Sequence, residues 1–193
     1  AEDFSLRDHF ASVSQQLSRF GVLQGVRNTD WLSAVTLVAT YHRRERAMKK
    51  NPLLTQFPTV ACGRQNILDL ALADYQQFAP MTLAGFEQAA KFLHSLGYVH
   101  PGDIAYPSQL LALASALAII GLPNDLGRTQ LEQWWWSCSF GEVYNNGQNK
   151  RTANDTTELP QWLAGGNAPS NLDKVHFNRE RLLQVTRRQG AIY

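Results

Sequence analysis

Three tryptophans stand side by side in the stretch Leu131-Glu132-Gln133-Trp134-Trp135-Trp136-Ser137-Cys138-Ser139-Phe140-Gly141-Glu142-Val143-Tyr144. Successive residues of an α-helix are turned by about 100°, so the three indole rings cannot share one face of a helix. A helix that is apolar most of the way round is usually buried in a larger helical body, and each ring brings about 150–250 Å² of surface to bury. We therefore predict that this stretch is the central helix of the fold, that Gly141 ends it, and that the other helices pack around it.

The predicted core is aromatic and is concentrated in this stretch and in one helix beyond it. Its members are Trp134, Trp135, Trp136, Phe140, Tyr144 and Trp162. An alternative is that the tryptophans form an exposed platform on which nucleic-acid bases stack. We favour burial because apolar patches of that size are uncommon on the surface of soluble monomers.

The composition is that of an ordinary globular protein. Apolar residues make up 44% of the 193 residues, and this length suits one domain with a core, so we expect a single helical domain over residues 1–193. The net charge of +2 does not by itself indicate a nucleic-acid partner. The two cysteines are too few for a disulfide framework, which is typical of a reduced, cytoplasmic protein.

No segment predicts insertion into a membrane or transfer across one. The longest apolar run, Leu110 to Leu122, is shorter than the roughly 18 residues of a transmembrane helix, and Ser115 interrupts it. The first residues lack the basic and apolar regions of a signal peptide. The chain opens at Ala1 rather than at methionine and stops at Tyr193, so we expect it to be a piece of a larger multidomain protein.

Hydrophobic periodicity predicts about eight helices and no alternating strand, which makes the fold an all-α, irregular multi-helix bundle. Helices are predicted at residues 6–20, 29–50, 64–75, 82–96 and 107–120, through the tryptophans to 140, at 157–163 and at 177–188. Asp3 or Ser5 is expected to cap the first helix, and Pro107 to stand in the first turn of the fifth. The inner side of the third helix is expected to carry Ile67, Leu68, Ala71, Leu72 and Tyr75. Residues 51–58 are expected to form a loop, because a proline stands near each of its ends.

Two basic groups could contact phosphates. The first lies at the end of the second predicted helix and consists of Arg43, Arg44, Arg46, Lys49 and Lys50. The second lies near the end of the chain and consists of Lys174, Arg179, Arg181, Arg187 and Arg188. On one common surface, the two groups would form a nucleic-acid face. Otherwise the first group is a solvated helix end whose cations compensate the helix dipole, whereas the guanidinium forks of the second suit phosphate.

A candidate enzyme site consists of Glu142, Arg151 and Asp155, which flank the polar stretch after the tryptophans. Such residues can orient a substrate, but more often they form an ion pair and a helix cap, here with Asp155 capping the helix at 157–163. The five histidines are scattered, and the sequence has no glycine-rich phosphate loop, no Cys-x-x-Cys and no His-x-x-x-His. We therefore expect no catalytic residue, no cofactor and no metal.

Several motifs resemble those of large bacterial proteins of the GmrSD restriction type. One block is Trp134-Trp135-Trp136-Ser137-Cys138-Ser139-Phe140-Gly141-Glu142-Val143-Tyr144, followed by Arg151, Asp155, Trp162 and Gly165-Gly166. A second block is Arg181-Leu182-Leu183, followed by Thr186-Arg187-Arg188-Gln189-Gly190-Ala191-Ile192-Tyr193. Similar motifs of the middle region are Cys62-Gly63-Arg64, Ile67-Leu68 and Tyr106-Pro107. Together these motifs span nearly all of the chain.

In this family a ParB-like N-terminal domain hydrolyses nucleotides, a C-terminal His-Asn-His (HNH) domain cuts DNA, and a helical region joins them. The chain resembles only the joining region, because it lacks the Asp-Gly-Gln-Gln-Arg motif of the first domain and the nuclease motif of the last. It departs from the family at Gln189-Gly190, where Asn-Ser is usual, so no role is assigned there. The resemblance implies flanking ParB-like and HNH domains as partners.

The sequence therefore predicts a non-catalytic helical scaffold and interaction domain of a DNA restriction (phage-defence) endonuclease. The side chains expected to contact the DNA backbone are Arg43, Arg44, Arg46, Arg179, Arg181, Arg187 and Arg188. One alternative is a free-standing nucleic-acid-binding module. Another is a small enzyme with its site at Glu142, Arg151 and Asp155. The oligomeric state stays open.

Overall fold

Seven α-helices make up most of the described part of the chain, which is residues 4–53 and 55–176 of a computed structural model. They are α1 (Leu6–Leu17), α2 (Asn28–Lys50), α3 (Arg64–Leu68), α4 (Leu72–Ser95), α5 (Pro107–Ile120), α6 (Asp125–Phe140) and α7 (Gln148–Leu163). Short 3-10 helices lie between them: η1 (Gly21–Leu23), η2 (Pro101–Asp103), η3 (Val143–Asn145) and η4 (Leu172–Lys174). These residues contain no strand, so the all-α class is confirmed. The helix predicted at 177–188 lies outside the described residues.

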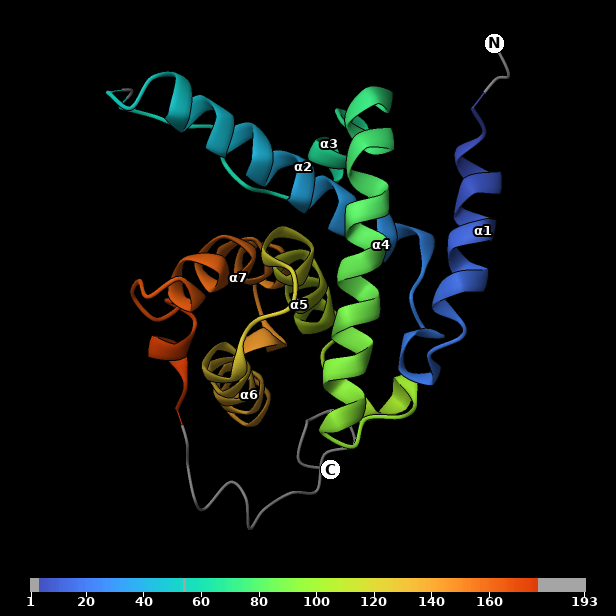
Figure 1. The fold of residues 1–193 in the computed structure, drawn as a ribbon, viewed down its shortest axis with the longest axis vertical. Helices are drawn as coiled ribbons and strands as arrows, with labels where there is room; N and C mark the ends of the chain where they lie inside the picture. Colours follow the sequence, from blue (N-terminus) through green and yellow to red (C-terminus); the bar gives the residue numbers. More distant parts are fainter. Residues whose placement is uncertain (1–3, 54, 177–193) are drawn as a thin grey trace.

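The central helix is α5, which packs between α4 and α7 and is crossed by α2 (Figure 1). Every residue from Gln109 to Ala118 is buried. Alanines at alternate positions of α5 (112, 114, 116 and 118) leave room for helices to approach from several sides. The prediction that the tryptophan helix is central is therefore wrong. That helix, α6, lies to one side of the bundle and turns only part of its circumference inward (Figure 1).

The contact between α4 and α5 is close because a glycine lies in it. A Cβ atom on Gly85 of α4 would stand 2.2 Å from the carbonyl oxygen of Ala114 and 2.7 Å from the backbone nitrogen of Ala118, both in α5. The next turns of α4 bury Phe86 and Leu93 completely. The close approach of the two backbones is what allows these larger side chains to reach the core on either side.

The region 64–96 divides into helices differently from the prediction. The short α3 ends at Leu68, and α4 begins at Leu72 and continues through Pro80, whereas we expected one helix at 64–75 and a new start near Thr82. Leu68 and Leu72 are exposed (68% and 52%), not buried. A proline inside a helix removes one backbone hydrogen bond and strains the preceding turn. Here the burial of Phe78 on that turn outweighs this cost.

The last described helix, α7, begins at Gln148, nine residues before the predicted start at Thr157. Its first turns contain no large apolar residue, so hydrophobic periodicity could not reveal them. Thr152 and Thr156 are nevertheless buried. Each hydroxyl donates to a carbonyl oxygen of its own helix, at 2.8 Å to Gln148 and at 2.8 Å to Thr152, so burial leaves neither hydroxyl without a hydrogen bond. Buried threonines that satisfy their own hydroxyls thus replace apolar residues on this face.

Several local predictions agree with the structure. The Ser5 hydroxyl accepts from the backbone N–H of Asp8 and caps α1, and Pro107 is the first residue of α5. Residues 51–58 form a loop, apart from residue 54, which is not described. No helix in the described part of the chain has both the length and the apolar character needed to span a bilayer.

Candidate functional site

The second half of α2 leaves the core and carries the first basic group. Residues from Trp31 to Tyr41 contain all the buried positions of this helix, and none of residues 42–50 is buried. An α-helix of 23 residues is about 34 Å long, and its last turns project beyond α4 and α7 (Figure 1). We call residues 42–50 the basic segment. It presents Arg43, Arg44, Arg46, Lys49 and Lys50 to solvent or to the chain beside it.

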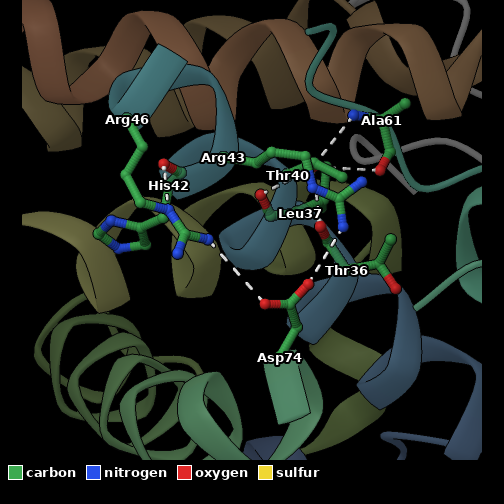
Figure 2. A network of polar contacts seen from close by, with 8 residues as sticks. All are labelled: Thr36, Leu37, Thr40, His42, Arg43, Arg46, Ala61 and Asp74. Carbon is green, nitrogen blue, oxygen red and sulfur yellow. Dashed lines mark hydrogen bonds and ion pairs between the residues drawn. The ribbon is translucent and has the colours of Figure 1, made fainter. Parts of the chain in front are cut away.

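Two arginines of the basic segment converge on one carboxylate. Arg43 Nη2 lies 3.1 Å from Asp74 Oδ2, and Arg46 Nη2 lies 3.9 Å from Asp74 Oδ1 (Figure 2). Asp74 stands in the first turn of α4, where a negative charge also suits the helix dipole. The arginine side chains are 47% and 60% exposed, so these ion pairs contribute little to the free energy of folding. Asp74 was not a predicted site residue, because the sequence placed it at the end of a helix rather than at the start of one.

Arg44 contacts the loop that follows the basic segment. Its Nη1 donates to the carbonyl oxygen of Pro58 at 3.2 Å, and its guanidinium carbon lies 5.8 Å from the centre of the Phe57 ring. Lys49 and Lys50 in the last turn are exposed. Of the predicted cations on this segment, the two lysines therefore have the most open access to a partner.

His42, the first residue of the basic segment, packs against α4. Its ring stacks on Phe78 with centroids 5.0 Å apart and an interplanar angle of 6°. Burial lowers the pKa of His42, and the nearby charge of Arg46 lowers it further. The imidazole is therefore neutral near pH 7, and the positive charge of the basic segment comes from its arginines and lysines.

The second basic group lies almost entirely outside the described residues. Arg179, Arg181, Arg187 and Arg188 belong to residues 177–193, so their part in a common surface with the basic segment stays a prediction. Lys174 is described: its Nζ donates to Oδ1 of Asn171, the residue before η4, at 3.2 Å.

The aromatic rings of the tryptophan stretch differ in burial according to the side of α6 on which they lie. Trp134 and Trp135 are fully buried, as is Tyr144, and Trp162 of α7 is buried at 9% exposure. Trp136 is half-buried and stacks on Phe140, with centroids 5.5 Å apart and an interplanar angle of 15°. Phe140 is 39% exposed, so its assignment to the core is wrong.

Asp155 is a buried carboxylate at the junction of α6, η3 and α7. Its Oδ2 accepts from Trp134 Nε1 at 3.1 Å and from the Tyr144 hydroxyl. Its Oδ1 has no hydrogen-bond partner among the described residues. Burial raises the pKa of Asp155 to about 6, although the donor groups of Tyr144, Asn171 and Trp134 favour the charged carboxylate and act in the opposite direction. Burial also raises the pKa of Tyr144, so its hydroxyl stays protonated and donates a hydrogen bond to Asp155.

The three residues of the candidate enzyme site, Glu142, Arg151 and Asp155, lie in different surroundings. Asp155 lies inside α7 and is completely buried, so its assignment as a helix cap is wrong. Glu142 is in the left-handed region (φ 50°) and accepts from Asn145 Nδ2 at 2.9 Å. The backbone carbonyl of Arg151 accepts from Asn171 Nδ2 at 3.0 Å, which ties η4 to α7. Asn171 is buried, and nothing in the sequence pattern pointed to it.

Two hollows of the described surface lie away from these residues. One of about 360 Å³ is lined by Leu6, Arg7, Phe10, Asn28, Trp31 and Leu32. Another of about 320 Å³ is lined by residues around Phe20, Lys91 and Tyr98. Within the described ranges, no three His, Cys, Asp or Glu side chains are grouped in a way that could hold a metal ion. Both cysteines are buried thiols, and burial raises the pKa of Cys62 to about 11.

Comparison with known proteins finds no matching family model, no matching curated protein and no matching solved structure. Membership of the GmrSD type therefore stays a prediction from the sequence motifs.

Proposed function

We propose that this chain is a non-catalytic helical scaffold and interaction domain of a GmrSD-like restriction endonuclease, and that its basic segment contacts the DNA backbone. The observation that carries the DNA contact is the position of the segment. Its cations stand on helix turns that have left the core, and Lys49 and Lys50 in the last turn are exposed to an approaching duplex. Contacts from lysine and arginine to phosphates supply most sequence-independent affinity for DNA.

The arrangement of Asp155 supports a scaffold rather than a reaction centre. Its carboxylate is enclosed, and Trp134 and Tyr144 hold it between three elements of the fold. A group that must meet a substrate needs an open approach, whereas this one joins helices. The small-enzyme alternative at Glu142, Arg151 and Asp155 is therefore disfavoured.

The proposal is tested by titrating the chain into a labelled duplex of about 20 base pairs and following fluorescence anisotropy at several salt concentrations. The test variant is Lys49→Gln/Lys50→Gln, because both side chains are exposed. We expect its affinity to fall about threefold to tenfold and its salt dependence to become shallower by about two in log–log slope, since each phosphate contact contributes about one.

The control variant is Arg19→Gln/Lys91→Gln, which removes the same charge from exposed positions outside the basic segment. It should keep the wild-type affinity to within about twofold. An equal loss in both variants would mean that only net charge matters, and no binding by the wild type at low salt would remove the DNA contact. Tight binding by the isolated chain would favour the free-standing nucleic-acid-binding module over a scaffold that works only beside its partner domains.

A further inference from the structure

The two arginines that meet Asp74 already have the geometry of an anion site. Arg43 and Arg46 are three residues apart on α2, which places them on one face of the helix. Both guanidinium groups point to the same carboxylate, each to a different oxygen (Figure 2). The site is therefore occupied by an anion of the protein itself.

The helix holds this arginine pair, Arg43 and Arg46, in place. Arg46 Nε also lies 3.4 Å from the carbonyl oxygen of His42, one turn back on α2. The His42 ring stacks on Phe78 and so joins this part of α2 to α4. Loss of the carboxylate would leave two guanidinium groups on a supported helix face.

The ligand class follows from the chemistry of the pair. A guanidinium fork binds carboxylate and phosphate oxygens with similar geometry. A phosphodiester offers two unesterified oxygens on one atom, as a carboxylate does. The Asp74 side chain is 22% exposed and the arginine side chains are about half exposed, so a phosphate can reach the pair from solvent.

We propose that the arginine pair is a phosphate site for the DNA backbone and that Asp74 occupies it in the unbound protein as an intramolecular competitor. The proposal rests on the proposed function, because it assigns a regulatory residue to the same surface. An exposed ion pair is weak, so DNA displaces Asp74 at a modest cost in affinity. The Asp74 carboxylate thereby lowers the affinity of the basic segment for DNA.

The test is the DNA affinity of Asp74→Asn, measured by the same anisotropy titration. Asparagine keeps the shape of the side chain but removes the charge that competes with phosphate. We expect binding about twofold to fivefold tighter than wild type and a steeper salt dependence, by about one in log–log slope. Adding Arg43→Gln/Arg46→Gln to Asp74→Asn should abolish the gain, because the site itself is then lost.

The matched control is Glu132→Gln. Glu132 pairs with Arg128 at 3.2 Å on the surface of α6, so this change removes one charge and releases one arginine elsewhere. An equal gain in Glu132→Gln, or no gain in Asp74→Asn with an unchanged melting temperature, overturns the role of Asp74. If Lys49→Gln/Lys50→Gln weakens binding while Asp74→Asn does not alter it, the proposed DNA contact is supported and the proposed role of Asp74 as a competitor is overturned. Absence of binding by wild type and Asp74→Asn alike overturns both.

Discussion

The environment of Trp135 makes it a test of the core at the scale of one residue. Its ring is 1% exposed and has edge contacts with Trp134 at 6.0 Å and with Tyr98 at 5.6 Å between centroids. Replacement by alanine removes these contacts and leaves a cavity, so we expect Trp135→Ala to lower the free energy of unfolding by about 3–5 kcal/mol. Thermal or urea denaturation measures this loss, which is a large fraction of the roughly 5–15 kcal/mol by which a domain is ordinarily stable.

Phe140→Ala is the control for that change, because it removes a large ring from the same helix at a position that is 39% exposed. Its cost should be well below that of Trp135→Ala, at about 1 kcal/mol. A melting temperature of Trp135→Ala close to that of the wild type would contradict the burial of this ring.

The sequence indicates that Phe140 shares one side of α6 with Trp136, but not that this side faces solvent. Trp136 and Phe140 are four residues apart and so lie on one stripe of α6, and they stack there. Because Trp134, Trp135 and Trp136 cover most of a helix circumference, one of them must turn outward unless the helix is surrounded. Trp136 turns outward and Phe140 follows it. We assumed a surrounded helix, and the choice between the two arrangements depends on packing that the sequence pattern does not contain.

At the scale of elements, α4 shows which boundaries a sequence can and cannot predict. Strong local signals gave the start of α1 at Ser5 and of α5 at Pro107. Pro80 is an equally strong local signal, yet α4 continues through it. Tertiary burial on both sides of Pro80 decides the outcome, since Tyr75 and Phe86 of the same helix are both buried. The start of α7 was missed for the opposite reason, because its buried face is polar.

The junction of α4 and α5 gives a prediction at this scale. Gly85→Ala would bring a methyl group within 2.2 Å of the Ala114 carbonyl oxygen, so the helices must separate. Overpacking of this kind costs about 1–3 kcal/mol, whereas alanine in an open helix position gains up to about 1 kcal/mol over glycine. We expect a net loss of stability in urea denaturation, because the blocking atoms are backbone.

Gly102→Ala is the control for the junction. A Cβ atom at Gly102 has no atom within 4 Å, so this change should leave the midpoint of denaturation nearly unaltered. A Gly85→Ala variant as stable as the wild type would show that α4 and α5 can move apart freely.

At the scale of the whole molecule, Asp155 joins elements that the sequence could not bring together. Its partners Trp134 and Tyr144 are 21 and 11 residues away along the chain and belong to α6 and η3. Gln109 adds a second link, since its Nε2 donates to the carbonyl of Trp135 at 2.9 Å and its Oε1 accepts from Ser139 at 3.0 Å. Hydrophobic periodicity identifies helices but not such polar links, so the sequence pattern predicts neither the buried position of Asp155 nor the link through Gln109.

The buried carboxylate makes stability depend on pH. The folded pKa of Asp155, about 6, is above the ordinary value of 3.8, because burial and the charge of Glu158 favour the protonated form. The protonated group thus stabilises the fold fully below about pH 4, and this contribution is lost as the pH rises through 6. Between pH 4 and pH 7 we expect the unfolding free energy of the wild type to fall, compared with that of Asp155→Asn, by on the order of 3 kcal/mol.

The difference between wild type and Asp155→Asn is the quantity to measure, by urea denaturation at each pH, because the other carboxylates cancel in it. Asp103→Asn is a control of opposite sign. The backbone N–H groups of His100 and Val99 lower the pKa of Asp103, so its contribution is present above about pH 4 and is lost as the pH falls further. If the difference in unfolding free energy between wild type and Asp155→Asn did not change with pH, Asp155 would have the same pKa in the folded and the unfolded chain. Its burial would then not raise its pKa.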